Sequence, residues 1–331
     1  MKTYTAFQAI NGELQEVRLP IPSPNNEQVL IKVEACGICG ADKNDVANAK
    51  VPRVVGHEVI GRIVVVGKNV PKRWAIGQRV GVGRLGGHCN ECDTCRRGTF
   101  NLCPNQTIIG ATADGGYAEY VLVRHTGLVS VPNELDPVQS APLLCAGLAT
   151  FNALKKSGAE AGDLVAIVGV GGLGHLAVQY AVKMGFEVAA IGRKTELAER
   201  VYALGAHHYL TGDNIVQQLQ HLGGAKAIIS TINHADTVAE IVKSLAPQGK
   251  LVLLGGDKTP LALSIGQFIG GERSVIGSLT GTPLENEKTL KFSRLSHIQA
   301  QIERYPLSQA KTAFERMKSG EVRFRAVLEM K

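Results

Sequence analysis

Aromatic residues, long apolar runs and blocks of like charge are all scarce in this chain of 331 residues. Phe, Trp and Tyr make up 5% of it, and its Lys and Arg residues are scattered despite a formal net charge of +7. A nucleic-acid-binding surface needs clustered cations, so we expect no nucleic acid partner. The most apolar stretch, 164–186, is interrupted by glycines at 169–174, so we expect no membrane-spanning helix, which needs about 20 apolar residues.

Cysteine is absent from the second half of the chain, because all seven cysteines lie between positions 36 and 145. The opening residues, MKTYTAFQAI, lack the basic and then apolar pattern of a secretory signal, so we expect a cytoplasmic protein. Hydrophobic residues make up 44% of the chain and charged residues 20%, which excludes global disorder. The length is sufficient for two domains.

Four of the cysteines are spaced C-x2-C-x2-C-x7-C, as Cys89, Cys92, Cys95 and Cys103. Thiolates at these separations can converge on one tetrahedral zinc ion. Four sulfur ligands leave no open position, so the spacing predicts a structural and not a catalytic zinc site. The alternative is a pair of disulfides, which the expected cytoplasmic location disfavours.

Two kinds of pattern divide the chain. The first part is rich in short β-branched runs, which predict strands at 28–36, 61–67, 78–83 and 118–124. A helical stretch follows at 136–157, with Asp136 as a candidate N-cap. Strands and helices then alternate, which predicts an α/β fold with a doubly wound parallel sheet. The strands are expected at 164–169, 187–192, 225–231, 250–256 and 274–278, and the helices at 173–185, 195–205 and 234–245. Two more helices, at about 285–300 and 308–318, and a strand at 323–330 complete the prediction.

A glycine-rich loop lies between the first strand and the first helix of this alternating part. It reads Gly169, Val170, Gly171, Gly172, Leu173, Gly174, which is G-x-G-x-x-G. In this context the glycines permit a tight turn and a close approach of the backbone to a pyrophosphate, at a helix N-terminus that favours anions. The sequence therefore predicts a dinucleotide cofactor. An ordinary glycine-rich turn is the alternative.

The end of the second strand bears on which dinucleotide is used. An NAD-binding fold commonly has a carboxylate there for the adenosine ribose, whereas this chain has Gly192, followed by Arg193 and Lys194. Loss of the acid removes repulsion of a 2′-phosphate, and the two cations can pair with it. We therefore expect NADP(H). The alternatives are NAD(H), or that the two cations are merely solvent-exposed residues at the start of a helix.

Five motifs lie along the chain: CGICGAD at 36–42, GHEVIG at 56–61, the four-cysteine segment, LLCAGLATFNAL at 143–154 and GVGGLG at 169–174. Together they resemble the zinc-dependent medium-chain alcohol dehydrogenase family over essentially the whole chain. No single one of these motifs is specific, but the set is. The resemblance implies a GroES-like catalytic domain, at 1–146 and 277–331, and a Rossmann domain at 147–276.

The resemblance also implies site residues. Cys39, His57 and Cys145 match the ligands of a catalytic zinc with an open position, and Glu58 matches a carboxylate that can approach the metal. Asp42 matches the acid that orients the ligand histidine. Arg325 matches a residue that contacts the cofactor pyrophosphate, so the expected cofactor-binding set is Gly169, Gly171, Gly172, Leu173, Gly174, Gly192, Arg193, Lys194 and Arg325.

The activity implied by the resemblance is the zinc-dependent interconversion of primary alcohols and aldehydes, with two zinc ions per chain, hydride transfer to or from NADP(H), and small-molecule alcohols or aldehydes as substrates. Members of the family are commonly homo-tetramers or homo-dimers. An NAD(H)-dependent alcohol dehydrogenase and a catalytically weak cofactor-binding scaffold or sensor are the alternatives.

Two positions depart from the family pattern. Many members have Ser or Thr two residues after the first zinc-ligand cysteine and His three residues further on, whereas this chain has Ala41 and Asn44. Neither side chain can pass a proton as the hydroxyl and imidazole do. Three explanations remain: a proton route through water and the cofactor ribose, a preference for reduction or for an unusual substrate, or weak activity.

Overall fold

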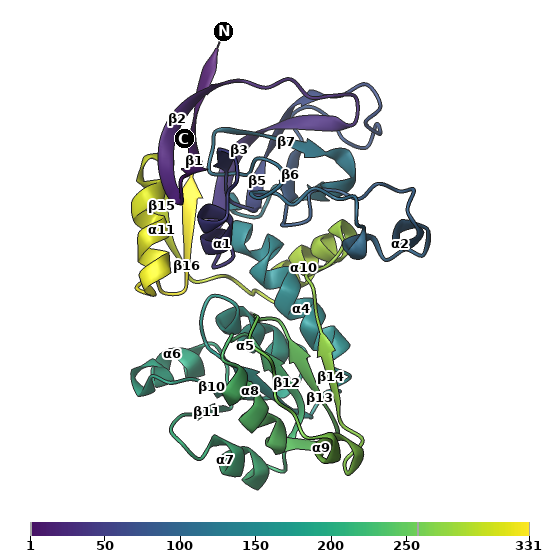
Figure 1. Cartoon of the computed structure of the whole chain (residues 1–331), viewed down its shortest axis with the longest axis vertical. Helices are drawn as coiled ribbons and strands as arrows, with labels where there is room; N and C mark the ends of the chain where they lie inside the picture. Colours follow the sequence, from purple (N-terminus) through teal and green to yellow (C-terminus); the bar gives the residue numbers. More distant parts are fainter. Residues whose placement is uncertain (1, 257, 331) are drawn as a thin grey trace. The chain divides into compact units, whose positions relative to one another are not determined.

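The computed structural model describes residues 2–256 and 258–330, which fold into two compact units (Figure 1). The first unit is built from both ends of the chain, up to Leu148 and from Gly281 onward, and the second unit is Ala149–Thr280. Within these described ranges, no helix is both long and apolar enough to cross a membrane.

The second unit contains a six-stranded sheet in the order β11-β10-β9-β12-β13-β14, with every neighbouring pair parallel. The strands are β9 (Leu164–Val168), β10 (Glu187–Ile191), β11 (His208–Leu210), β12 (Ala225–Ser230), β13 (Leu245–Leu253) and β14 (Ser274–Gly277). The order runs outward from β9 in both directions, which is the arrangement of a doubly wound dinucleotide-binding sheet. The predicted parallel sheet is therefore confirmed.

Burial of the central strands explains why these segments form the sheet. All five residues of β9 are buried, as expected for a parallel strand covered on both faces. The connections are α5 (Gly174–Lys183), α6 (Ala198–Ala203), α7 (Ile215–His221), α8 (Ala235–Ile241) and α9 (Ile265–Ile269). The short elements β11, α7 and α9 were not among the predicted ones.

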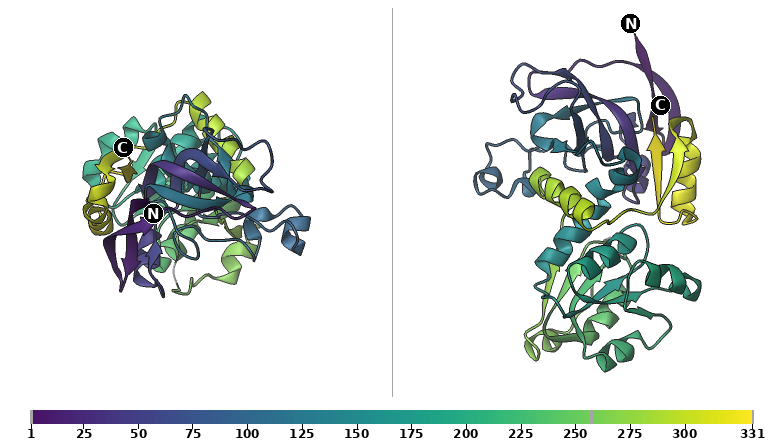
Figure 2. Two further views of the ribbon diagram at one scale, coloured as in Figure 1. Left: turned by 90° about the horizontal axis from the view of Figure 1, so that it is seen from above. Right: turned by 180° about the vertical axis from the view of Figure 1, so that it is seen from behind.

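The first unit is rich in strands, as predicted. One sheet has the order β15-β16-β3-β5-β6-β8, with β7 also paired to β3, and a second has the order β2-β1-β4. Their bounds are β1 (Thr3–Ile10), β2 (Glu13–Pro20), β3 (Gln28–Ile38), β4 (Arg53–Val54), β5 (Glu58–Val66), β6 (Arg79–Val82), β7 (Tyr120–Arg124), β8 (Val129–Ser130), β15 (Ile302–Pro306) and β16 (Arg325–Glu329). In Figure 2, α11 (Ala310–Ser319) lies along β15 and β16.

The hairpin of β1 and β2 was not predicted, although a local signal for it exists. Asn11 and Gly12 form its turn with φ angles of 53° and 82°. An Asn-Gly pair with both φ angles positive is typical of the tight turn that joins two antiparallel strands. The register, Ile10 opposite Glu13, follows directly from this two-residue loop.

The helical stretch predicted at 136–157 divides into three segments: α3 (Pro137–Ser140), η3 (Ala141–Leu144) and α4 (Ala146–Lys156). The Asp136 side chain accepts hydrogen bonds from the backbone N–H groups of Val138 and Gln139, as an N-cap does. The division between η3 and α4 falls at Cys145, whose φ and ψ are −125° and −72°. The later helix α10 (Pro283–Leu295) begins with a capping box between Thr282 and Glu285 and ends before the expected residue 300.

Candidate active site

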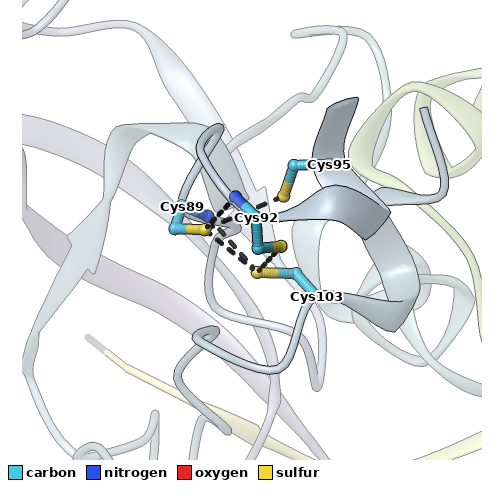
Figure 3. A group of neighbouring side chains, drawn as sticks. All are labelled: Cys89, Cys92, Cys95 and Cys103. Atoms are coloured by element: carbon cyan, nitrogen blue, oxygen red, sulfur yellow. Dashed lines mark hydrogen bonds between the residues drawn. The ribbon is translucent and has the colours of Figure 1, made fainter. Parts of the chain in front are cut away.

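The four clustered cysteines lie in a lobe around α2 (Asp93–Arg96) that projects from the β-rich part of the first unit (Figures 1 and 2). Figure 3 shows their sulfurs pointing toward one another. Sγ–Sγ distances are 3.6 Å for Cys89–Cys103, 3.8 Å for Cys92–Cys103 and 4.0 Å for Cys89–Cys95. Four sulfurs at about 2.3 Å from one tetrahedral zinc lie about 3.8 Å apart, so the geometry fits zinc. It does not fit disulfides, and all seven cysteines are free.

The electrostatics of this lobe also call for a cation. A hydrogen bond from the Asn105 side chain, followed by backbone N–H groups, lowers the pKa of Cys89 to about 6. Burial and the neighbouring thiols Cys92 and Cys103 instead raise the pKa of Cys95 to about 12. Four sulfurs this close resist becoming thiolates together unless a metal ion neutralises them.

A second cluster in the first unit contains Cys39, His57, Glu58 and Cys145. One candidate ligand atom from each lies within 4.8 Å of all the others. Cys39 follows β3, His57 precedes β5, Glu58 begins β5, and Cys145 is the residue at which η3 gives way to α4. Residues 106 positions apart in the sequence thus meet because β3, β5 and η3 pack together.

The donor set of this cluster fits a zinc ion with one open position. His57 Nε2 lies 3.4 Å from Cys145 Sγ, close to the about 3.6 Å expected of nitrogen and sulfur on one tetrahedral zinc. The hydrogen bond between the two thiols lowers the pKa of Cys39 and raises that of Cys145. In the absence of a cation the pair therefore retains a proton, which two thiolate ligands would have to release.

Asp42, in the first turn of α1 (Asp42–Ala47), ties two of these residues together. Its Oδ1 lies 2.9 Å from Nδ1 of His57, which leaves Nε2 directed toward Cys145. Its Oδ2 accepts hydrogen bonds from the backbone N–H of Cys39 at 2.9 Å and from the Tyr117 hydroxyl at 2.7 Å. Asp42 and Tyr117 are both fully buried. The structure thus places Asp42 where it can orient His57.

Tyr117 was not singled out in the sequence, although the glycine next to His57 is needed to make room for its ring. Gly56 has a φ of 93°, and a Cβ there would overlap the Tyr117 ring. The backbone before His57 therefore needs glycine both for its conformation and for the space that the ring occupies.

Glu58 and Arg325 form a buried ion pair between β5 and β16. One guanidinium nitrogen of Arg325 contacts Glu58 Oε1, whereas Glu58 Oε2 is buried without a hydrogen-bond partner in the described residues. Burial, only partly opposed by Arg325, raises the pKa of Glu58 to about 7. An unpaired carboxylate oxygen beside three candidate ligands suits a nearby cation. The expected contact of Arg325 with a cofactor pyrophosphate stays a prediction.

Another ion pair, also missed in the sequence, lies next to His57. Arg84 follows β6 and grips Asp45 of α1 through both terminal nitrogens, with Nη2 at 2.9 Å from Oδ1. Its Nη1 is 3.4 Å from His57 Nδ1. Ala41 lies at the start of the same helix and Asn44 is exposed on it. The charged pair thus stands near positions where a hydroxyl and an imidazole are missing.

The glycine-rich loop connects β9 to α5 in the second unit, as predicted. Gly169 has a φ of 91°, and a Cβ on Gly174 would overlap the Gly169 carbonyl, so both need glycine. A Cβ on Gly171 would meet nothing within 4 Å, which leaves the backbone open to a pyrophosphate. The Thr231 hydroxyl donates to the carbonyls of Val168 and Gly169 and holds the start of the loop.

Gly192, Arg193 and Lys194 follow β10, and both cations are exposed. A residue that sequence reasoning missed, Tyr209 of β11, packs against this turn. Its hydroxyl donates a hydrogen bond of 2.8 Å to the carbonyl of Lys194. Lys194 Nζ lies 4.0 Å from Glu196 Oε1. The turn thus carries two solvent-facing cations and one nearby carboxylate.

Comparison with known protein families gives two matches. The model of the alcohol dehydrogenase GroES-like domain matches residues 25–133, and that of the zinc-binding dehydrogenases matches residues 172–294. With the parallel sheet already described, these matches confirm the predicted combination of a GroES-like and a Rossmann domain.

Individual relatives cover almost the whole chain. The alcohol dehydrogenase notN of Aspergillus sp. (strain MF297-2) is 41% identical over 323 residues, which are 96% of this chain and 94% of that protein. The solved structure of the cinnamyl alcohol dehydrogenase SbCAD4 from Sorghum bicolor has a TM-score of 0.90 at 31% identity, covering 99% of this chain and 98% of the other. The structure of CAD from Helicobacter pylori complexed with NADP(H) has a TM-score of 0.89 at 29% identity, with coverages of 99% and 98%.

Proposed function

The chain belongs to the zinc-dependent medium-chain alcohol dehydrogenases, oxidoreductases that act on alcohols, and from this premise we propose that it interconverts primary alcohols and aldehydes with NADP(H). The observation that carries the proposal is the convergence of Cys39, His57, Glu58 and Cys145 in one cluster. A three-ligand zinc site of the Cys₂His type keeps a position open for substrate, which the four-cysteine lobe does not.

We assign two zinc ions to each chain. Cys39, His57 and Cys145 would hold the catalytic ion, with Glu58 in reach of it, and the cysteines of the lobe would hold the structural ion. When bound, zinc would act as a Lewis acid on the substrate oxygen while the nicotinamide exchanges a hydride with the substrate carbon.

The chain's own residues then have distinct tasks around the catalytic cluster. Asp42 holds the Nδ1 side of His57, which fixes the ring and leaves Nε2 for the metal. Arg325 compensates the buried charge of Glu58, which would otherwise be costly. The fully buried positions of Asp42, His57 and Glu58 keep water away from these groups, so their interactions are stronger than at the surface.

Proton transfer is the step for which this chain is least equipped. Ala41 has no hydroxyl, and Asn44 does not titrate, so neither can take the proton that alcohol oxidation releases. A positioned proton acceptor contributes about 10²–10⁴-fold to such steps. Aldehyde reduction must gain the same proton, so these two positions bear on both directions equally, and we propose that the proton passes through water instead.

For the cofactor we propose NADP(H). Gly192 leaves no carboxylate at the end of β10, and Arg193 and Lys194 are exposed beside it. These cations can pair with an adenosine 2′-phosphate, whose charge an acid at position 192 would repel.

We also propose a homo-oligomer, a dimer or tetramer, assembled through the second unit. Strand β14 is at the edge of its sheet as described, and such an edge offers unpaired backbone groups to a second copy. Ile265 and Ile269 on α9 are 77% and 74% exposed, which adds apolar surface.

Initial rates of aldehyde reduction test the proposed reaction. Benzaldehyde and a short aliphatic aldehyde are supplied with NADPH and NADH in parallel, before and after chelation of the metal. We expect turnover that needs zinc and a kcat/KM that is higher with NADPH. A higher kcat/KM with NADH would refute the cofactor assignment, and no turnover by the zinc-loaded protein would refute the reaction.

A further inference from the structure

Tyr209 occupies the space beside Gly192 in which a ribose-binding side chain would stand. Gly192 directly follows β10, the position at which an acid binds the adenosine ribose in NAD-dependent folds. A Cβ built on Gly192 would lie 3.0 Å from Tyr209 Cε2 and Cζ, and closer still to the hydroxyl. A contact as short as the one to the hydroxyl is essentially never seen, so a side chain at position 192 and the Tyr209 side chain as placed exclude each other.

The sheet fixes Tyr209 in this place. Ala190 pairs with Tyr209 in the parallel register of β10 and β11, and the N–H of Gly192 donates to the carbonyl of Leu210 at 3.2 Å. From there the Tyr209 hydroxyl reaches the Lys194 carbonyl at 2.8 Å. The turn that carries the two cations is thus fastened to β11 by a side chain from outside the turn.

We propose that Tyr209 is a specificity-determining residue for the cofactor, because it takes the place of the ribose-binding carboxylate and fixes the turn that presents Arg193 and Lys194 to the 2′-phosphate. The inference rests on the proposed use of NADP(H). It adds that the preference for NADPH depends on the Tyr209 ring, which fills the space beside Gly192, and on its hydroxyl, which fixes the backbone of the turn. The two cations and the missing acid are then only part of the cause.

The charges around Tyr209 agree with this role. Burial and the nearby Glu196 raise the pKa of Tyr209, so the hydroxyl stays neutral at physiological pH and does not repel a phosphate. Lys194 has a loose, exposed ion pair with Glu196. A phosphate group carries about −1.5 to −2 charges at neutral pH, so it can compete with the single negative charge of Glu196 for Lys194.

A purely structural role for Tyr209 makes a different prediction, which allows a test. If the ring only packs against Gly192, removal of the hydroxyl should leave the preference between NADPH and NADH unchanged. If the hydroxyl fixes the turn, its removal should weaken NADPH binding selectively, since NADH has no 2′-phosphate to lose contact with the cations.

The experiment measures dissociation constants of NADPH and NADH for the zinc-loaded full chain, by nicotinamide fluorescence and by calorimetry, so that binding is read without turnover. We expect Tyr209→Phe to weaken NADPH binding about 3–10-fold, the effect of one neutral hydrogen bond, and to leave NADH within twofold. The matched control is Tyr202→Phe, an exposed tyrosine of α6 in the same unit, which should change neither constant.

A double variant tests the occupied space. Gly192→Asp alone should not improve NADH binding, because Tyr209 blocks the carboxylate, whereas Gly192→Asp with Tyr209→Ala should bind NADH at least tenfold more tightly than Gly192→Asp alone. Thermal unfolding checks that the variants fold, and Tyr209→Phe decides by itself should the others fail to do so.

The outcomes separate this inference from the proposed function. Wild-type protein that binds NADH more tightly than NADPH would refute the proposed cofactor and this inference with it. Suppose instead that the wild type prefers NADPH. If Tyr209→Phe then changes neither affinity, or weakens the binding of both cofactors equally, the role of Tyr209 alone is overturned. Tight NADH binding by Gly192→Asp alone would do the same.

Discussion

Replacement of Tyr117 by Phe should loosen the catalytic zinc without touching the structural one. The change removes only the hydroxyl that donates to Asp42 Oδ2 at 2.7 Å and keeps the ring that fills the space beside Gly56. A hydrogen bond to a charged group contributes about 1.5–3 kcal/mol, and the buried carboxylate would retain only the Cys39 N–H on that oxygen.

The magnitude follows from what Asp42 does for the cluster. Partners that orient a ligand histidine are worth about 10–100-fold in metal affinity, and Tyr117 acts on that partner and not on His57 itself. We therefore expect zinc affinity at the catalytic site to fall by about tenfold, or about 1.4 kcal/mol, with the remainder of the lost hydrogen bond lowering the free energy of unfolding.

Competition with a chromogenic chelator measures this affinity, because we expect the two proposed zinc ions, which have different ligand sets, to be released at different chelator concentrations. The ion of the four-cysteine lobe serves as an internal reference. Tyr120→Phe is the matched control, since the Tyr120 hydroxyl forms no hydrogen bond within residues 2–256 and 258–330 and its ring packs edge-on against Tyr4. If Tyr117→Phe bound the catalytic zinc with an affinity within twofold of wild type, the hydrogen bond from Tyr117 to Asp42 would contribute nothing to zinc binding by His57, and this prediction would be refuted.

Three further predictions concern other parts of the first unit. Burial tends to raise the pKa of Asp136, but hydrogen bonds from Arg304 and from backbone N–H groups outweigh burial and hold this pKa below its usual value. The charge of Asp136 therefore stabilises the fold fully above about pH 4, and less as the pH falls through the lowered pKa. Urea titrations should show Asp136→Asn less stable than wild type at pH 7, by under about 1 kcal/mol for this exposed pair, and a gap that closes in acid; a gap that widens there would contradict the sign. Arg84→Met should cost roughly 3 kcal/mol of unfolding free energy, because the Asp45 side chain is 6% exposed and would lose its cation; Arg84→Met combined with Asp45→Asn should recover part of it, and no recovery would argue against the ion pair as the cause. Cys103→Ser should leave one zinc per chain by elemental analysis and destabilise the lobe, and a full complement of two would disprove the four-cysteine site.

Local sequence patterns were sufficient to predict the four-cysteine cluster and the glycine-rich loop. The four cysteines lie within one short segment, and the glycine-rich loop joins a strand to the helix that follows it, so chain geometry alone brings their parts together. The strand β9 and helix α5 around that loop follow from burial and periodicity over a few residues. The β1–β2 hairpin also had a local signal at its Asn-Gly turn, which the prediction did not use.

Contacts between distant segments could not be read in the same way. The Tyr117–Asp42 hydrogen bond spans 75 positions, and the Arg84–Asp45 pair joins the end of one strand to a helix from another part of the chain. Spacing in the sequence carries no information about such meetings, because they depend on the register and packing of the sheets. Tyr209 illustrates this limit, since only the pairing of β10 with β11 brings its ring over Gly192.

The pairing of β16 with β3 has a consequence for how the protein is made. Arg325 reaches Glu58 across a sequence separation of 267 residues, and β16 also supplies a neighbour for β3, the strand that leads to Cys39. On the ribosome, the earlier part of the first unit and the whole second unit emerge before β16. Until β16 follows, the Glu58 carboxylate has no counter-charge and one side of β3 is unpaired. We expect the nascent chain to complete the proposed catalytic zinc site only once β16 has emerged, whereas the four-cysteine lobe can bind its proposed zinc ion earlier in translation.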